Sequence, residues 1–199
     1  MRTIRAAPPF GEIQQTMRDE AADDPELRDQ VGDIVRQVAE GGDRVLLELT
    51  ARLDRHRAGT VADLRLGATD FEKAAAAVEP ELLAALKRAA ANIDAFHRRQ
   101  LERGFLDLLP DGSVLGQRVE PLRRVGVYVP GGRAAYPSSL LMTVVPARVA
   151  GVQEVTVCSP TPDGEINPAV LAAAHVTGVD ELFRVGGAQA IAAMAYGTE

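Results

Sequence analysis

The sequence predicts an α/β fold, with an N-terminal, mostly helical region over residues 1–122 that includes a small hairpin, followed by βαβ units over residues 123–199. Apolar residues recur at helical spacing through most of the first region. In the second region, short β-branched runs alternate with stretches of helix length. Two of these runs end in a glycine pair, which is typical of a tight turn from a strand into a helix. We therefore expect a parallel sheet, because parallel strands need crossover helices between them.

The first region contains clear signals for where helices begin and end. Asp23 and Asp24 stand before Pro25 and mark a helix start, within a helical pattern that runs from Phe10 to His56. The pattern then predicts, in chain order, a break at Gly41-Gly42, a short strand at 62–66, a helix at 69–78 capped by Thr69, a longer helix at 80–103, and an antiparallel hairpin around the turn at 108–113.

The second region alternates between strand and helix with short connections. The expected strands are 123–129, 154–158 and 181–185, and the expected helices are 138–150, 167–176 and 187–196. Ser138 and Ser139 offer N-cap oxygens to the first of these helices. Helices of this length between strands favour right-handed βαβ units.

The stretch from Val125 to Ser139 is the best candidate for a ligand site. A β-branched strand runs into Pro130-Gly131-Gly132 and then into a helix, and Gly186-Gly187 repeats this geometry further along the chain. Strand, glycine turn and helix start together leave unpaired amides at one crevice, so the two turns can line one cleft. The plainer interpretation is that each turn only connects a strand to a helix.

Composition points to small molecules as partners and argues against nucleic acid and membranes. The net charge of −6 provides no basic patch for nucleic acid or an anionic membrane, and no stretch of about 18 apolar residues could span a bilayer. The chain start has no apolar segment typical of a signal peptide. The single Cys158 lies in an apolar strand, which favours a core thiol. We therefore expect a cytoplasmic protein.

Long segments of the chain resemble histidinol dehydrogenase. The similar segments are RVGVYVPGGRAAYPSSLLMTVVPARVAGV and GGAQAIAAMAYGTE, with GQRVEPL, NIDAFHRRQ and GGDRVLLELTARLD upstream. The resemblance implies that this sequence corresponds to the N-terminal half of that family's chain. Residues 123–199 are then expected to form the first half of a Rossmann-like NAD-binding domain, with an incomplete parallel sheet. It also implies zinc- and NAD-dependent oxidation of L-histidinol to L-histidine in two hydride transfers, the last steps of histidine biosynthesis.

Two residues match cofactor-contacting positions of the family. The resemblance implies that Tyr128, before Pro-Gly-Gly, and Gln189, in Gly-Gly-Ala-Gln, contact NAD. A tyrosine at a strand end can pack its ring on a cofactor, and a glutamine in the first turn of a helix can hydrogen-bond. The competing interpretation makes Tyr128 a half-buried strand residue and Gln189 a polar group at a helix start. Neither turn contains the G-x-G-x-x-G pattern, so the cofactor prediction depends on the family.

The catalytic part of the family pattern lies beyond this sequence. The zinc ligands and the Glu-His acid–base pair follow the Gly-Ala-Gln helix in the family, and we expect them beyond residue 199. The three histidines, His56, His97 and His175, form no ligand spacing, so we assign no metal ligand and no catalytic residue. Two alternatives remain: a related polyol or alcohol dehydrogenase of the same fold, or a non-catalytic module for nucleotide binding or dimerisation.

The sequence also predicts self-association. The resemblance implies a homodimer, and half of a doubly wound sheet leaves a strand edge and apolar helix faces open. The faces expected to need cover carry Leu140, Leu141, Val144 and Val145 in one helix and Ile191, Met194 and Tyr196 in another. We expect either association through these surfaces or marginal stability.

Overall fold

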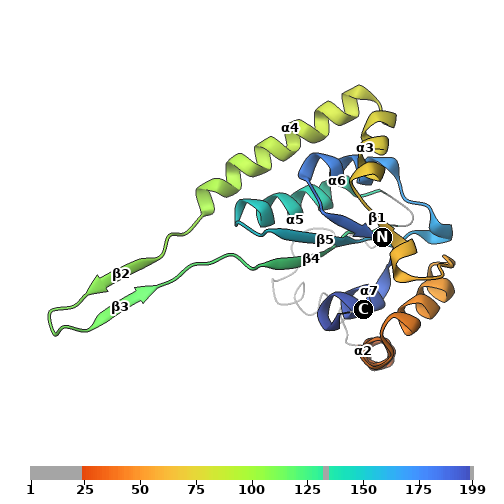
Figure 1. Cartoon of the computed structure of the whole chain (residues 1–199), viewed down its shortest axis with the longest axis horizontal. Helices are drawn as coiled ribbons and strands as arrows, with labels where there is room; N and C mark the ends of the chain where they lie inside the picture. Colours follow the sequence, from red (N-terminus) through yellow and green to blue (C-terminus); the bar gives the residue numbers. More distant parts are fainter. Residues whose placement is uncertain (1–23, 132–134, 198–199) are drawn as a thin grey trace, which may run out of the picture.

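The protein is described by a computed structural model that covers residues 24–131 and 135–197. Within them, four strands form one sheet in the order β1-β6-β5-β4, and β2 and β3 form a separate hairpin. Strands β4, β5 and β6 run parallel, whereas β1 joins β6 antiparallel. The predicted α/β fold with a mostly parallel sheet is confirmed (Figure 1).

The N-terminal elements follow the predicted order. They are α2 (Pro25–Leu53), β1 (Arg65–Leu66), α3 (Ala68–Ala77), α4 (Pro80–His97), β2 (Phe105–Leu108) and β3 (Val114–Gln117). Asp24 begins α2, because its carboxylate accepts the N–H groups of Glu26 and Leu27. Gly42 interrupts α2 with a φ of 54°, which confirms the break predicted at the glycine pair. Residues 10–23 of the expected helical pattern, and with them Asp23, lie outside the described residues.

Three predicted boundaries in this region are wrong. Only β1 is a strand in the segment 62–66, because Thr60 caps a 3₁₀ turn over Val61–Leu64. Thr69 does not cap α3; the cap is Gly67, whose N–H donates to the Asp70 carboxylate at 3.0 Å. Helix α4 ends at His97 rather than near residue 103, and a short 3₁₀ turn follows it.

The C-terminal elements are β4 (Arg124–Tyr128), α5 (Pro137–Val149), β5 (Glu154–Cys158), α6 (Pro168–Thr177), β6 (Glu181–Phe183) and α7 (Gly187–Tyr196). They match the predicted ranges to within two residues at each end. The helix α5 is capped by Tyr136 through its backbone, and the expected caps Ser138 and Ser139 lie inside its first turn. Strand–helix alternation was therefore easier to predict than the caps.

The sheet separates two apolar layers. On one face, Val127 and Val129 pack with Val155, Val157 and residues of α5 and α6, and α3 and α4 lie outside those helices (Figure 1). On the other face, Tyr128 packs with Cys158 and residues of α7 and α2. The alternation of Val127 and Tyr128 along β4 assigns them to opposite faces, as the period of a strand requires.

The prediction that the apolar face of α5 is uncovered is wrong. Its four residues Leu140, Leu141, Val144 and Val145 are buried, because α4 and α6 pack against α5. In α7, by contrast, Ile191 and Tyr196 are exposed. The N-terminal region, through α4, thus covers part of the C-terminal region, and its strand β1 also joins the sheet. The division into two domains at residue 122 stays a prediction.

Helix α7 lies directly against β4 because Gly126 has no side chain. A Cβ atom at this position would overlap the Sδ atom of Met194 and lie 3.1 Å from its Cγ atom. Such a contact is closer than packed side chains tolerate, so a side chain at position 126 would displace the Met194 side chain from its present position against β4.

Asp54 connects the end of α2 to the start of α7. It is the C-cap residue of α2, and its Oδ2 atom accepts the N–H of Gly186 at 3.1 Å. The side chain is only 9% exposed, and burial raises the pKa of its carboxyl above the ordinary value of 3.8, partly opposed by the Gly186 hydrogen bond. Beside it, Arg55 forms a two-bond ion pair with Asp163 in the loop after β5.

The β2–β3 hairpin extends away from the sheet as an arm (Figure 1). All eight of its strand residues are exposed. Among the residues that the structure describes, none of the helices has both the length and the apolar character that crossing a membrane would require.

We predict that Asp54 stabilises the junction of α2 and α7 as a hydrogen-bond acceptor rather than as a charge. Asp54→Ala should lower the free energy of unfolding by about 1–3 kcal/mol, because it leaves the Gly186 N–H unpaired. Asp54→Asn keeps an acceptor oxygen and should change stability by less than about 0.5 kcal/mol. Chemical denaturation measures both, with the exposed Asp29→Ala in the same helix as the control.

The pH dependence of stability separates the two roles further. Between pH 3.8 and the raised pKa in the folded state, folded Asp54 binds its proton more tightly than unfolded Asp54. The Asp54 contribution to the free energy of unfolding should therefore fall as pH rises through that window. Asp54→Asn should abolish this slope. An unchanged slope in the variant would show that the carboxyl does not titrate as described.

Candidate functional site

The carboxyl ends of three parallel strands meet at one edge of the sheet. Pro130 and Gly131 follow β4, the segment from Ser159 to Pro162 follows β5, and Gly186-Gly187 follows β6. Loops at this edge form the usual ligand crevice of open α/β sheets. Gly132, the last residue of the predicted Pro-Gly-Gly turn, lies outside the described residues.

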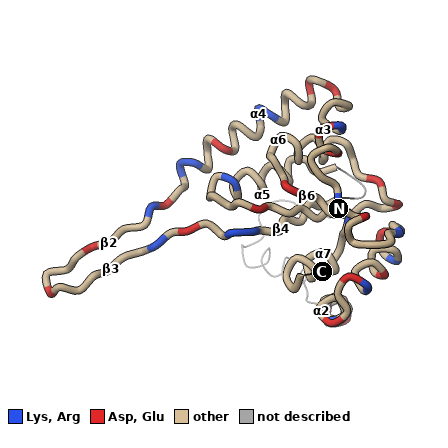
Figure 2. The backbone as a smooth tube through the Cα atoms, in the orientation of Figure 1, with Lys and Arg blue, Asp and Glu red and all other residues tan. Residues whose placement is uncertain are grey.

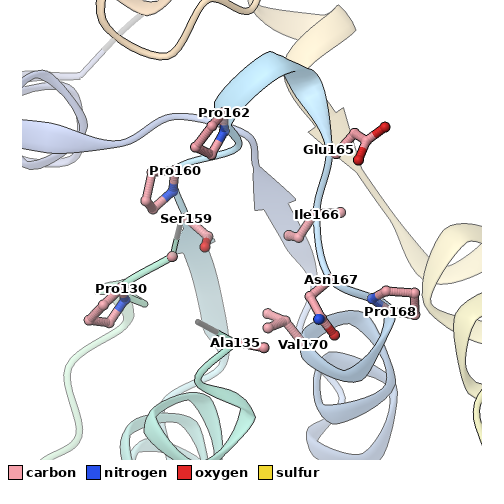
Figure 3. Close-up of a pocket in the computed structure, with 11 residues that line it drawn as sticks. Pro130, Ala135, Ser159, Pro160, Pro162, Glu165, Ile166, Asn167, Pro168 and Val170 are labelled. Carbon is pink, nitrogen blue, oxygen red and sulfur yellow. The ribbon is translucent and has the colours of Figure 1, made fainter. Parts of the chain in front are cut away.

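A cavity of about 370 Å³ lies at this edge (Figure 3). Its volume is in the range of pockets for small ligands. Pro130 and Ser159 lie on one side of it, and Asn167 on the other, at the start of α6. Asn167 also caps α6, because its Oδ1 atom accepts the N–H of Ala169 at 2.9 Å. The remaining lining residues are Gly131, Ala135, Pro160, Pro162, Glu165, Ile166, Pro168 and Val170.

Pro160 lies between the two glycine turns. A Cβ atom at Gly131 would lie 2.7 Å from the Pro160 carbonyl oxygen, and one at Gly186 would lie 3.0 Å from its Cα atom. The first turn lines the cavity, whereas neither glycine of the second turn is among its lining residues. This cavity alone therefore does not show a cleft lined by both turns, although both turns pack close to Pro160.

Tyr128 and Gln189 are brought together at the second turn. The N–H of Gly187 donates to the Tyr128 hydroxyl at 3.1 Å. A Cβ atom at Gly187 would lie 2.5 Å from Gln189 Oε1, and the φ of 62° at Gly187 also favours glycine. The two predicted residues thus both lie beside Gly187, although neither lines the 370 Å³ cavity.

The Gln189 side chain is buried without a hydrogen-bond partner in the described part of the chain. It is 1% exposed, and both its Nε2 and its Oε1 atoms are unpaired there. A buried amide without partners costs about 1–3 kcal/mol for each unpaired group. Such a group is a candidate for contact with a ligand, since a partner would recover part of that cost.

A polar cluster next to the turn was missed by sequence reasoning. Asp54 accepts the Gly186 N–H, and the Nδ1 atom of His56 lies 3.4 Å from the Thr161 hydroxyl. Burial, followed by the charge of Arg184, lowers the pKa of His56. Asp54 lies near the end of the predicted helical pattern, but only the folded chain brings it to Gly186. These residues support the turn and the loop after β5.

The described residues offer neither a metal site nor a reactive thiol. In 24–131 and 135–197, no three His, Cys, Asp or Glu side chains converge as metal ligands. His97 lies at the end of α4, edge-on to Phe96, and His175 is exposed on α6. Burial, with a smaller effect of Glu181, raises the pKa of the Cys158 thiol to about 12, so it stays protonated at neutral pH. Cys158 is the core thiol that the sequence predicted.

A second, larger cavity of about 660 Å³ opens over the α7 face of the sheet. Arg65, Arg124, Thr156 and Glu181 line it together with Met194. Arg65 pairs with Glu181 at 3.1 Å, and Thr156 donates to the same carboxylate at 3.0 Å. Its polar groups are largely paired with one another, in contrast to the Gln189 amide.

Comparisons with known proteins agree on one family. The family model for histidinol dehydrogenase matches residues 17–199. Histidinol dehydrogenase of Syntrophotalea carbinolica is 53% identical over 173 residues, which cover 87% of this chain and 40% of that protein. The Pseudomonas fluorescens protein of the same name is 44% identical over 201 residues, covering 100% of this chain and 46% of the relative.

Solved structures give the same result. The crystal structure of histidinol dehydrogenase from Elizabethkingia anophelis superposes with a TM-score of 0.80 at 34% identity, over 89% of this chain and 40% of that chain. The chain thus spans less than half of the length of these relatives. The match of the family model to nearly the whole sequence shows that the chain belongs to the histidinol dehydrogenase family and corresponds to its N-terminal part.

Proposed function

We propose that this chain forms the first part of the NAD site of an enzyme that oxidises L-histidinol to L-histidine. The observation that carries the proposal is the pair of Gln189 and Tyr128 at Gly187, where a buried amide has no partner among the described residues. The pair lies at the carboxyl edge of a parallel sheet, where dinucleotides bind in folds of this type. Family membership supports the same ligand.

The residues present fit a dinucleotide in two respects. The Gln189 amide offers a donor and an acceptor, and the Tyr128 hydroxyl can donate its proton while it accepts from Gly187. NAD supplies the hydride acceptor when it is bound. In this proposal, Tyr128 and Gln189 bind and orient the cofactor, and neither is a catalytic residue.

The rest of the proposal comes from the family. L-Histidinol is the substrate, the enzyme is a homodimer, and it acts in the cytoplasm on a small molecule rather than on nucleic acid or membranes. The described residues do not fit a zinc ion, because they bring no three ligands together. On the family resemblance, we assign the family's zinc to a part of the family's length beyond residue 199, and no catalytic step is derived through it.

Two alternatives make different predictions. A related alcohol dehydrogenase would bind NAD through the same residues but would oxidise another alcohol, which assays with a panel of polyols would reveal. A non-catalytic nucleotide-binding or dimerisation module is favoured by one observation, the lack of a metal-ligand cluster among the described residues. It would bind a nucleotide or a second copy without accelerating any oxidation.

We predict that Tyr128→Ala and Gln189→Ala each weaken NAD binding about 5- to 30-fold in the intact enzyme, since each removes one hydrogen bond or ring contact. The affinity for L-histidinol should change less. Calorimetric titration with NAD and with L-histidinol measures both. The same titration on this chain alone tests whether its part of the site suffices for binding.

Matched controls lie away from the proposed site. Gln153→Ala removes an exposed glutamine just before β5, at the amino edge of the sheet, and Tyr196→Ala removes an exposed tyrosine at the end of α7. Both should leave NAD affinity within about twofold of the parent protein. Equal losses in the site variants and in these controls would refute the assignment of Tyr128 and Gln189.

We predict that this chain by itself neither oxidises L-histidinol nor retains one zinc ion after dialysis. No zinc site can be assembled from the described residues, and the family's Glu-His acid–base pair is expected beyond residue 199. Atomic absorption on the dialysed protein, with the intact enzyme in parallel, measures the metal content. One retained zinc that is lost on substitution of His56, His97 or His175 would contradict this account.

A further inference from the structure

The three residues after helix α2, called here the brace (residues 54–56), connect two loops of the carboxyl edge. The side chain of Asp54 accepts the Gly186 N–H at 3.1 Å, and its backbone oxygen accepts the Asp163 N–H at 2.9 Å. Arg55 binds the Asp163 carboxylate through two hydrogen bonds. Charged residues of both signs lie along α2 (Figure 2). The brace thus joins the loop after β6 to the loop after β5.

The backbone at the brace adopts a conformation that side chains disfavour. Among residues 24–131 and 135–197, only Arg55 and Asp163 combine a side chain with a positive φ, at 54° and 60°. This left-handed region has a steric cost for residues other than glycine, and such residues persist where the surrounding contacts fix them. Here the two residues are bound to each other. The strained positions therefore lie where the brace meets the loop after β5.

The buried contact of the brace is the one that Asp54 makes. The side chains of Arg55 and Asp163 are 65% and 64% exposed, so water and salt screen their ion pair and it adds little to stability. The hydrogen bond from Gly186 to Asp54 is buried, and a buried amide that loses its partner is costly. The Asp54 bond is therefore the contact of the brace that fixes the second glycine turn.

The second glycine turn needs contacts from outside it to keep one conformation. Glycine has more backbone freedom than any other residue, and here two glycines follow one another. The N–H of Gly186 donates to Asp54. The next N–H, that of Gly187, donates to the Tyr128 hydroxyl, and Gln189 Oε1 lies beside the same residue. Only the φ and ψ of Gly186 separate these two amides, so fixing the first restricts the second.

We propose that Asp54 is a positioning residue for NAD: its hydrogen bond to Gly186 holds the glycine turn in the conformation that keeps Tyr128 and Gln189 in place for the cofactor. The inference rests on the proposed NAD site. Asp54 acts through Gly186 and does not contact the cofactor. Without Asp54, the turn would have to become ordered when NAD binds, and this ordering would reduce the affinity.

A purely structural role for Asp54 makes a different prediction. Loss of its hydrogen bond would then lower stability without any specific effect on the turn or on NAD. Asp180 provides a matched control, because its Oδ2 atom accepts the Val155 N–H at 2.8 Å. It is also an aspartate that joins distant segments through a backbone amide, but it lies at the opposite end of β6 from Gly186.

The first experiment measures hydrogen exchange of single amides by mass spectrometry in the intact enzyme without NAD. Asp54→Ala should speed exchange of the Gly187 amide about tenfold, because the turn opens more often and releases its bond to Tyr128. Asp180→Ala should change this rate by less than about twofold. Unchanged exchange at Gly187 in Asp54→Ala would overturn the inference, whatever NAD does.

The second experiment titrates the intact enzyme with NAD and with L-histidinol by calorimetry. Asp54→Ala should weaken NAD binding about 5- to 10-fold and change the affinity for L-histidinol by less than about twofold. Asp54→Asn keeps an acceptor oxygen for the Gly186 N–H and should bind NAD within about twofold of the parent protein. Asp180→Ala should do the same. In turnover, Asp54→Ala should raise the KM for NAD with little change in kcat.

The outcomes separate this inference from the NAD site itself. Equal loss of NAD affinity in Asp54→Ala and Asp180→Ala, or Asp54→Asn that binds NAD as weakly as Asp54→Ala, would show that Asp54 only stabilises the fold. The NAD site would still stand if Tyr128→Ala and Gln189→Ala weakened NAD. If those two variants bound NAD normally, the NAD site would be refuted and the role of Asp54 in cofactor binding with it.

Discussion

The contact of Pro160 with Gly131 and Gly186 determines the arrangement of the whole carboxyl edge. The loops that follow β4 and β6 approach one proline in the loop that follows β5, which is possible only because both flanking residues lack a Cβ atom. A larger residue at either position would separate the loops. The cavity on one side, and the Tyr128–Gln189 pair on the other, both depend on this close packing.

The end of α2 supports this edge from the face of the sheet that α7 covers. Asp54 accepts the Gly186 N–H, and its neighbour Arg55 binds Asp163 in the loop after β5, so one short segment holds two of the three loops. Burial of the Asp54 carboxyl has an energetic cost, which its hydrogen bond offsets in part. The helical N-terminal segment therefore contributes to the site as well as to the core.

Sequence periodicity predicted the strands, the helices and the hairpin, because these depend on residues close together in the chain. Caps were harder: Thr69 and Ser138 are good cap residues, yet Gly67 and Tyr136 begin the helices. The cover of α5 by α4, the contact of Asp54 with Gly186 and the packing of both glycine turns against Pro160 could not be predicted, since each joins distant segments. Tyr128 and Gln189 were predicted from a family resemblance, and the structure adds that both lie beside Gly187.

Gly126 limits how sequences of this fold can vary. With α7 against bare backbone at that position, any side chain would meet the Met194 thioether first. A homologue with alanine or a larger residue there would need a different rotamer of Met194, a shorter side chain at position 194, or a helix displaced from β4. A substitution at position 126 should therefore be accompanied by a change in the size or the direction of the side chain at position 194.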